Sequence, residues 1–319
     1  MKSVITPQAM PAIVGPDGVL TVDAHLMLLR MAEALEEAQG LIAGMGDDMS
    51  DIAQAERVVL STYGDTVSVE AKGKNLNKFG RNLSVGSSYE TVAEFQGTVA
   101  NETFVSTNLI DSVSSSSASD TTQTIRVEGH VIDGSGNLTF TAQEVALNGQ
   151  TKVALPTPLA RATRANVQPT GAFGSEPAAL VGTVSVYDDT DGITAGVPNT
   201  DAAAKVLISA GESQSEKAST TISVGDYWFI KYISAGIGDA GSSANFVTVR
   251  MEARDVANGG AWRPMGKEVV LVPSQTGVSL TFDPLLIVPK NHDWRFRAKT
   301  DTNTAEVFAE AGGVLAVIQ

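Results

Sequence analysis

Apolar and polar residues alternate along most of the chain beyond residue 60, whereas the stretch before it has a different period. TVSVEAK, at residues 66–72, places Val67 and Val69 on one face, and ETFVST, TIRVEGHVI, LTFTAQEVAL and TKVAL continue the alternation. Clusters of Ser, Gly, Asn and Asp separate these runs. A period of two interrupted by turn residues is typical of antiparallel strands in a sandwich or barrel. The pattern therefore predicts a mainly β protein.

Residues 23–59 predict a helix instead. The segment is rich in Ala, Leu, Met and Glu, which favour helices, and Asp23 is suited to cap the first turn. Apolar residues recur at alternating intervals of three and four, at Leu28, Met31, Leu35, Ala38, Ile42, Met45, Met49 and Ile52. This heptad seam predicts a coiled coil through which copies of the chain associate, with a trimer as the first guess. The other interpretation is an amphipathic helix packed on its own domain and broken at residues 44–46.

A cluster of Pro and Gly divides the predicted strands into two blocks. Residues 169–178, PTGAFGSEPA, are typical of a junction, and a second β-rich block follows them. We therefore expect a helical attachment segment over residues 1–60 and two antiparallel β-sandwich or jelly-roll-like domains, over residues 61–170 and 171–319. Within the first block, residues 112–120, SVSSSSASD, have low complexity and predict a mobile loop.

One segment of the first block is repeated in the second. Residues 124–136 read TIRVEGHVIDGSG and residues 248–260 read TVRMEARDVANGG. At one fixed offset Arg126 aligns with Arg250, Glu128 aligns with Glu252, and QEVAL aligns with KEVVL. Each copy predicts a strand, a turn and a return strand, with Arg and Glu on a shared polar face. Duplication at the scale of a domain and coincidence between two similar hairpins are both open interpretations.

Composition and charge narrow the range of functions. The chain has no cysteine, which excludes disulfides and thiolate metal sites. Its formal net charge of −14 argues against binding nucleic acid. No apolar run approaches the roughly 20 residues of a membrane helix, and MKSVITPQAMPAIVG is a poor secretory signal. We therefore expect neither a nucleic-acid partner nor a membrane partner.

Few residues are spaced for catalysis or for ligand binding. No nucleophile elbow, phosphate loop or dinucleotide fingerprint occurs. Three histidines lack metal-ligand spacing to one another, namely His25, His130 and His292. The acidic run YDDTDG, at residues 187–192, matches only the middle of a calcium loop, because both obligatory end positions lack a ligand. We expect a solvated turn there, and we expect no cofactor, no metal, no catalytic residue and no enzymatic activity.

Aromatic residues provide a candidate binding surface. Tyr227, Trp228 and Phe229 are consecutive on a predicted strand, so they face both of its sides. Trp262 follows downstream. We identify Tyr227, Trp228 and Trp262 as candidate surface-binding residues, because aromatic side chains are enriched at interfaces. The interpretation that we favour is that they belong to the ordinary core, and a sugar-binding platform is a third interpretation.

Two segments of the sequence resemble a family of bacteriophage virion structural proteins. The first covers residues 124–167, where TIRVEG is followed by a turn, LNGQTKVAL and the basic LARATRANV. The second covers residues 210–319, with AGESQ, VGDYWFIKYIS and the segment Phe282-Asp283-Pro284. Gly225-Asp226 stands where the family pattern has a turn that contains proline. The predicted N-terminal helix lies outside the resemblance.

The resemblance implies a non-enzymatic component of a phage particle. It implies a location on the virion, self-association and contact with other virion proteins, such as capsid, portal or tail proteins. The favoured expectation is a head decoration, head-spike or fibre-base protein attached through residues 1–60. The alternatives are a tail or neck adaptor or fibre protein, with a host-surface glycan as a further partner, and a carbohydrate-binding or hydrolytic β protein outside any virus.

Overall fold

The computed structural model describes most of the chain beyond residue 56. The described residues are 57–62, 65–70, 74–94, 100–102, 104–169, 179–240, 246–256, 260–272 and 277–316. They fold mainly into antiparallel strands, which confirms the prediction from alternation. Strand β1 (Arg57–Thr62) forms a hairpin with β2 (Asp65–Glu70), so the last three residues of the predicted helix are in a strand. The rest of that helix lies outside the described residues.

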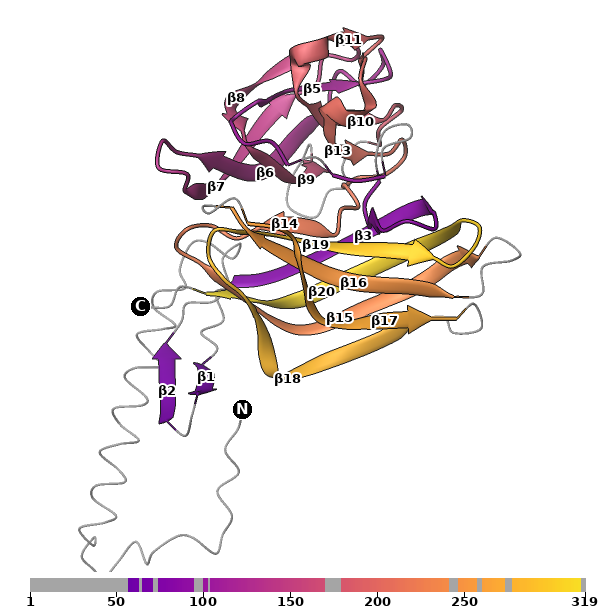
Figure 1. Ribbon diagram of the computed structural model, residues 1–319. Coiled ribbons are helices and arrows are strands. Elements are labelled where there is room, and N and C mark those ends of the chain that lie inside the picture. The colour runs from indigo at the N-terminus through magenta and orange to yellow at the C-terminus, as the bar shows by residue number, and fades with distance from the viewer. Residues whose placement is uncertain are drawn as a thin grey trace, which may run out of the picture. The chain divides into compact units, whose positions relative to one another are not determined.

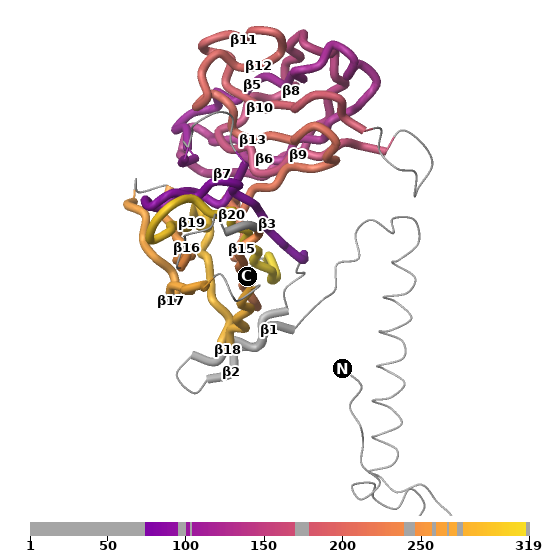
Figure 2. Tube along the Cα trace, turned by 90° about the vertical axis from the view of Figure 1, so that its right-hand side faces the viewer, coloured from indigo at the N-terminus to yellow at the C-terminus, as the bar shows by residue number. Residues whose placement is uncertain are grey.

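A larger sandwich consists of two antiparallel sheets (Figure 1). One sheet has the strand order β18-β15-β20-β3, and the other has the order β14-β19-β16-β17, with β4 paired to β19. The strands are β3 (Lys74–Val85), β4 (Glu90–Thr91), β14 (Ser219–Thr221), β15 (Tyr227–Ala240), β16 (Val247–Asp255), β17 (Arg263–Leu271), β18 (Val278–Val288), β19 (His292–Thr300) and β20 (Ala305–Ala316). Figure 2 shows the layer of β16, β17 and β19 beside the layer of β3, β15 and β20.

The core of the larger sandwich lies between these two layers. On β19, Trp294, Phe296 and Ala298 alternate with charged residues and are buried. Trp228 of β15 meets Trp294 edge to face, with the ring centroids 4.8 Å apart. Such an aromatic pair contributes about 0.5–1.5 kcal/mol beyond the burial of its surface. The alternation in the sequence therefore corresponds to one face in the core and one face outside it.

A smaller sandwich consists of a four-stranded sheet, β13-β10-β5-β8, and a three-stranded sheet, β7-β6-β9. Its core is aliphatic, with Ile125, Val127, Leu159 and Ile208 fully buried. The elements are β5 (Ile110–Ser115), β6 (Thr124–Ile132), β7 (Leu138–Ala146), β8 (Val153–Leu159), β9 (Arg161–Val167), β10 (Val184–Tyr187), β11 (Ile193–Thr194), β12 (Val197–Pro198) and β13 (Ala204–Ile208), with 3-10 helices η2 (Asp189–Asp191) and η3 (Asp201–Ala203).

The smaller sandwich is inserted into the larger one. Strands β3 and β4 precede it and β14 to β20 follow it, yet β3 pairs with β20 and β4 pairs with β19. Figure 1 accordingly shows the indigo β3 beside the yellow β20. The structure does not divide at residues 170/171, because β9 and β10, on either side of that point, line one core. Alternation identifies strands but not their partners, so a Pro- and Gly-rich segment within a domain has the same signature as a junction between domains.

The repeated segment forms the same hairpin in both sandwiches. Strands β6 and β16 each lie between two partner strands, and each pairs with the next strand in the chain. Arg126 lies 3.3 Å from Glu128 and 4.0 Å from a glutamate of the return strand. Arg250 lies 2.5 Å from Glu252 and 3.5 Å from the equivalent glutamate. The same ion pairs recur at equivalent positions, which favours duplication of the hairpin over coincidence.

The serine-rich run is not a mobile loop, contrary to the prediction. Ser112–Ser115 lie in β5 and are buried. The Ser115 hydroxyl donates to a carboxylate oxygen of Asp120 at 2.6 Å, and the same oxygen accepts from the backbone N–H of Gly182 at 2.9 Å. Hydroxyl groups that find partners inside the protein can be buried at little cost. The low-complexity run therefore includes the end of a polar strand, at residues 112–115, and the bend and turn that follow it, at residues 116–120.

Candidate functional site

Two segments of the chain connect the sandwiches, one that follows β4 and one that precedes β14. These two connectors run side by side. The Ala218 N–H donates to Val92 O at 3.0 Å, and the Glu94 N–H donates to Glu216 O at 3.2 Å. Both segments cross β3 at Gly80, where an added Cβ atom would lie 2.2 Å from Ala218 N and 2.5 Å from Val92 O. Only glycine allows this close approach of backbone to backbone.

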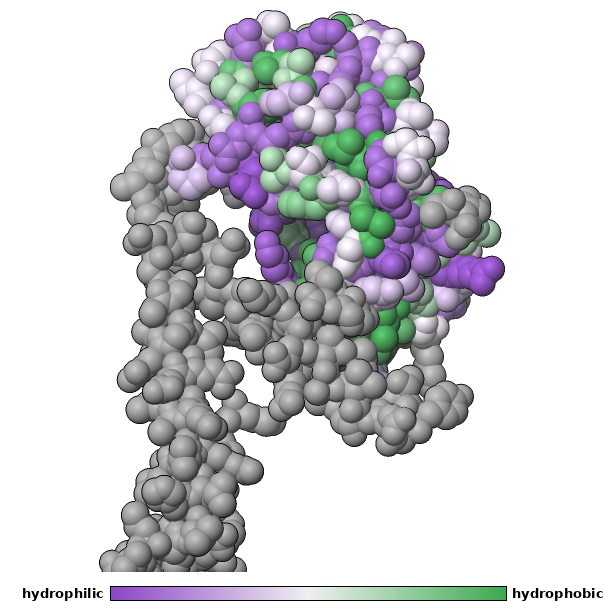
Figure 3. Space-filling model, turned by 90° about the vertical axis from the view of Figure 1, so that its left-hand side faces the viewer, coloured by the Kyte–Doolittle hydropathy of each residue, from purple (hydrophilic) through white to green (hydrophobic). Residues whose placement is uncertain are grey.

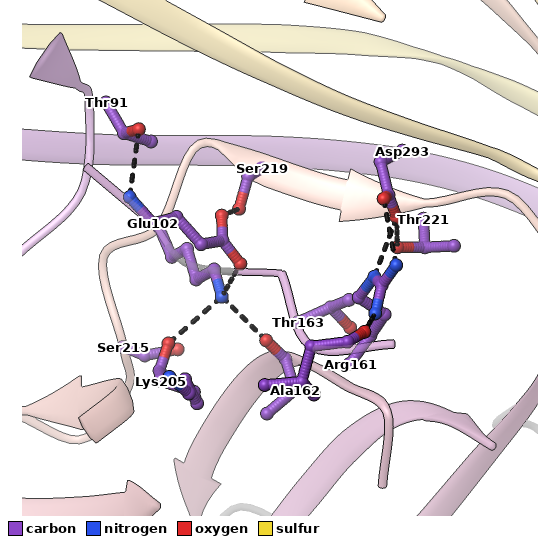
Figure 4. Close-up of polar contacts among 12 residues, drawn as sticks. Thr91, Glu102, Arg161, Ala162, Thr163, Lys205, Ser215, Ser219, Thr221 and Asp293 are labelled. Atoms are coloured by element: carbon purple, nitrogen blue, oxygen red, sulfur yellow. Dashed lines mark hydrogen bonds and ion pairs between the residues drawn. The ribbon is translucent and has the colours of Figure 1, made fainter. Parts of the chain in front are cut away.

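A buried ion pair joins β9 of the smaller sandwich to β19 of the larger one (Figure 4). Arg161 Nε and Nη2 donate to the two carboxylate oxygens of Asp293 at 2.9 and 3.0 Å. The two side chains are 4% and 0% exposed. Thr221 Oγ1 and Arg254 Nε also donate to this carboxylate, at 2.7 and 3.0 Å. One carboxylate thus links β9, β14, β16 and β19.

A second buried ion pair lies beside the paired connectors. Lys217 Nζ lies 2.6 Å from Glu102 Oε1 and donates to the carbonyl oxygens of Ala162 and Lys205 at 2.7 and 3.0 Å. Ser219 Oγ donates to the other oxygen of Glu102 at 2.6 Å (Figure 4). All three protons of the ammonium group therefore have acceptors. Because Ala162 and Lys205 belong to the smaller sandwich and Ser219 to the larger one, this pair also links the two.

The contact between the sandwiches that contains the Arg161–Asp293 and Lys217–Glu102 pairs is here called the junction. Two buried bases lie near it. Lys78 Nζ on β3 donates to Thr163 O on β9 at 3.2 Å, and burial lowers the pKa of Lys78 to about 8. Burial and the neighbouring ammonium group of Lys78 lower the pKa of His130 to about 3. The imidazole ring packs edge-on against Phe140, with the centroids 5.7 Å apart. Both shifts follow mainly from loss of water around the charged form.

Arginines outnumber carboxylates on the outer face of β16 and β19. The carboxylate of Glu252 lies 2.5 Å from Arg250, 3.0 Å from Arg295 and 3.9 Å from Arg297. Burial lowers the pKa of Arg295, although Glu252 acts in the opposite direction. Asp293 likewise forms ion pairs with two guanidinium groups, those of Arg161 and Arg254. This face therefore carries excess positive charge on a chain whose net charge is −14.

Aromatic rings cover these guanidinium groups. The Trp262 ring lies 3.8 Å from Arg295 Cζ and 4.9 Å from Arg254 Cζ. The Tyr89 ring lies 3.6 Å from Arg250 Cζ. Cation–π contacts of this kind contribute about 0.5–2 kcal/mol each, depending on desolvation. They fix the turn between β3 and β4 and the start of β17 against the sheet.

A cleft of about 610 Å³ opens where β16, β17, β18 and β19 meet their turns. Met265, Ile287 and Pro289 belong to its apolar part, and its charged or ionisable residues are Arg254, Asp255, Arg263 and His292. Arg263 is exposed and forms no ion pair within the described part of the chain. His292 Nδ1 lies 2.9 Å from Lys290 O. The combination of apolar walls with a few polar groups is typical of a binding cleft.

Exposed apolar residues elsewhere are dispersed over several strands. Leu83 lies on β3, Phe140 on β7 and Val270 on β17, with exposed fractions of 58%, 49% and 56%. On the face in Figure 3, hydrophobic residues form separate patches among hydrophilic ones. Single exposed apolar residues are ordinary on soluble proteins, so they do not by themselves mark an interface.

The three candidate surface-binding residues differ in how far they are buried. Trp228 is fully buried in the core, as the favoured interpretation expects, and it is therefore not a surface-binding residue. Its strand is covered on that face by the facing sheet, which the sequence does not reveal. Tyr227 is partly buried against Phe229 and Val314. Trp262 is partly buried between arginines, next to the cleft. The predicted seam lies outside the described residues, at Leu28, Met31, Leu35, Ala38, Ile42, Met45, Met49 and Ile52.

The sequence does not predict which residues form the junction. A signal for one of them exists in DWRFRAK, where Asp293, Arg295 and Arg297 alternate with apolar residues. Such alternation of charge on one face identifies a polar sheet surface. It does not identify Arg161, which lies far away in the sequence, as the partner of Asp293.

The acidic run forms a turn, as expected. Residues 189–191 make η2, and the Asp188 carboxylate accepts from the Thr190 N–H at its start. Within the residues that the structure describes, no group of three or more His, Cys, Asp or Glu side chains is placed to hold a metal ion. Among the helices in this part of the chain, none is long and apolar enough to cross a membrane.

Comparison with known proteins shows no family for this chain. No family model matches the chain, and no curated protein matches it in sequence. A structure of infectious bursal disease virus, Gt strain, resembles it with a TM-score of 0.22 and 8% identity over 82% of this chain and 74% of that one. The VP2 subviral particle of the same virus gives a TM-score of 0.20 and 10% identity over 82% and 75% of the two chains. Likeness at this level carries no argument about fold or function.

Proposed function

We propose that this chain is a non-enzymatic structural component of a virus particle, and more narrowly of a bacteriophage particle. Its place is the head, as a decoration, spike or fibre-base protein that attaches through residues 1–60 and presents the two sandwiches. The sequence resemblance to phage virion structural proteins supports this role. The observation in the structure that carries it is the junction, where buried ion pairs hold two sandwiches in one arrangement.

The energetics of the junction favour a role in holding geometry. Two charges removed from water recover their desolvation cost only when every hydrogen bond is satisfied, as at Asp293 and Lys217. Apolar residues of similar volume would give equal or greater stability. Directional ion pairs instead specify one relative placement of the sandwiches. Such fixed placement would suit a particle component whose neighbouring subunits contact both of its sandwiches.

Fractionation of purified particles tests the location. We expect the chain to remain with intact phage particles and to stay with heads after heads and tails are separated. Recovery with tails would assign it to the alternative role of tail or neck adaptor. Absence from washed particles would contradict the proposal. Cleavage of a glycan by the pure chain, lost on substitution of one carboxylate, would contradict its non-enzymatic part.

Self-association through the heptad seam is the second part of the proposal. In the full chain, Leu35→Asp with Ile42→Asp places charges on two seam positions, and we expect the mass in solution to fall to that of the monomer. Glu33→Lys, off the seam in the same segment, is the matched control and should leave the mass unchanged. An oligomer that survives the double substitution would show that copies associate elsewhere.

A further inference from the structure

A small apolar cluster lies on the outer face of the β18-β15-β20-β3 sheet, away from the core between the two sheets. Trp228 and Ile230 of β15 belong to that core, so Phe229 between them points to the other face of the sheet. Val314 and Ala316 of β20 join Phe229 there. Phe229, Val314 and Ala316 are 1%, 3% and 1% exposed. An apolar sheet face that is buried this deeply needs a second layer over it.

The strands that carry the cluster do not supply that layer. All of its described members, including the partly buried Tyr227 and Leu285, belong to β15, β18 or β20. These are neighbouring strands of one sheet, so they lie beside one another and do not stack over one another. The segment that covers the cluster therefore comes from another part of the chain or from a partner.

The β1–β2 hairpin has the pattern of such a layer. In its register Val58 pairs with Val69, and Leu60 pairs with Val67. Alternation along each strand puts these four apolar positions on one face of the hairpin and puts Val59 on the opposite face. A two-stranded hairpin is at best marginally stable by itself in water. The hairpin therefore needs a surface for its apolar face.

The chain connects the hairpin to the end of the sheet where the cluster lies. Only residues 71–73 separate β2 from β3, and Asn75, the second residue of β3, pairs with Val314 of the cluster. The four peptide steps from the last residue of β2 to the first residue of β3 span at most about 14 Å. Stacked sheets lie about 10 Å apart. The linker is therefore long enough for the hairpin to stack on this end of the sheet.

We propose that the apolar face of the β1–β2 hairpin packs on Phe229, Val314 and Ala316 of its own chain, as a third layer of the larger sandwich. The short linker favours the sheet of the same chain over that of a second copy, because it keeps the hairpin at a high effective concentration beside the cluster. The inference rests on the proposed function, because it names the surface through which the attachment segment, residues 1–60, is held to the sandwiches.

Thiol labelling tests the contact in the full chain, which has no cysteine of its own. Ala316→Cys places a thiol in the cluster, and we expect a maleimide to react with it slowly under native conditions. Adding Leu60→Asp puts a charge on the apolar face of the hairpin. This should raise the labelling rate at least about ten-fold, because burial of an unpaired carboxylate opposes docking. Val59→Asp, one residue away on the opposite face, is the matched control and should leave the rate unchanged.

Amide hydrogen exchange supplies a second arm that needs no added thiol. In the parent chain we expect slow exchange along β1 and β2. Leu60→Asp should raise this exchange at least about ten-fold, whereas β16 in the core of the larger sandwich should keep its protection. Val59→Asp should change neither. The inference is overturned by fast labelling of Ala316→Cys in the chain without a hairpin substitution, or by equal effects of Leu60→Asp and Val59→Asp in both arms.

The seam variant, Leu35→Asp with Ile42→Asp, separates docking within one chain from exchange of hairpins between copies. Slow labelling of Ala316→Cys should persist in this background. Labelling that becomes fast there would show that the hairpin of another copy covers the cluster, and docking within one chain would be wrong. A chain that stays with phage heads, but whose labelling does not respond to Leu60→Asp, would leave the proposed function standing without the docked hairpin. A chain that passes both arms but is absent from particles would do the reverse.

Discussion

At the scale of the residue, Asp293 is the position on which the charges of the junction converge. Asp293→Asn keeps the shape of the side chain but leaves Arg161 and Arg254 without a counter-charge. Removal of one partner from a buried pair typically costs about 3–5 kcal/mol. We expect the free energy of unfolding to fall by about 3 kcal/mol, measured by urea denaturation at neutral pH.

Glu144→Gln is the control for this substitution. Glu144 is 54% exposed and lies 4.0 Å from Arg126, so water screens the pair. Exposed pairs contribute about 0–1 kcal/mol, and the change should be small. Equal losses for Asp293→Asn and Glu144→Gln would show that the buried carboxylate does not hold the junction.

Lys78 presents the opposite case, a buried charge that forms no ion pair within the described residues, although Glu128 and Glu102 act on its pKa from a greater distance. Lys78→Met keeps the length of the side chain and removes the charge. The Thr163 carbonyl loses a hydrogen bond, but the cost of burying an ammonium group disappears. We expect the free energy of unfolding at neutral pH to rise by about 1–3 kcal/mol. Lys74→Met, exposed on the same strand, should leave it nearly unchanged.

The pH dependence of stability provides an independent measurement on Lys78. The pKa of Lys78 is about 8 in the folded protein and has its ordinary value of 10.5 in the unfolded chain, so the unfolded state binds more protons between these two pH values. The free energy of unfolding of the parent chain should therefore rise with pH across that window. Lys78→Met should lose this part of the rise. A slope that is identical in both chains would contradict the lowered pKa of Lys78.

At the scale of the element, the paired connectors cross β3 because residue 80 has no side chain. Gly80→Ala would place a Cβ atom against two backbone segments that cannot both move without breaking their hydrogen bonds. We expect a loss of about 1–3 kcal/mol or more in the free energy of unfolding. Gly225→Ala, where the added atom meets nothing within 4 Å, is the matched control. The two variants can be compared by thermal unfolding under one set of conditions, and equal midpoints would contradict the packing argument.

Elements with a strong local pattern could be predicted from the sequence, and their partners could not. The hairpins at Thr124 and Thr248 followed from alternation and turn residues, and the structure has both. The serine-rich β5 was missed because its hydroxyl groups find acceptors far away in the chain, as Ser114 does at Gly196. The inserted arrangement was missed because the pairing of β3 with β20 depends on contacts at nearly the greatest possible sequence separation.

The candidate site was less predictable than the fold. Trp262 was identified, but as an isolated aromatic residue rather than as a ring between Arg254 and Arg295. Trp228 remained a candidate for surface binding beside the favoured core interpretation, because a strand pattern does not say which face another sheet covers. Glu102 and Lys217 have no local signature, since their pairing depends on two connectors that are brought together only by the insertion.

At the scale of the whole molecule, insertion and burial act together. Two connectors, rather than one linker, join the sandwiches. The ion pairs of Asp293 and Lys217 also link one sandwich to the other. Opening the junction would expose charges that lose their partners without gaining a second stable arrangement. The two sandwiches should therefore behave as one cooperative unit, even though each has its own apolar core.

This cooperativity can be measured because the two sandwiches carry different probes. All three tryptophans, Trp228, Trp262 and Trp294, lie in the larger sandwich, so their fluorescence reports its unfolding. Amide hydrogen exchange along β6 reports the smaller one. In the parent chain we expect both probes to give one urea midpoint. In Asp293→Asn with Glu102→Gln, which removes both buried carboxylates of the junction, exchange along β6 should reach its limit at lower urea than the loss of fluorescence. Separate midpoints in the parent chain, or one shared midpoint in the double variant, would show that the ion pairs do not couple the sandwiches.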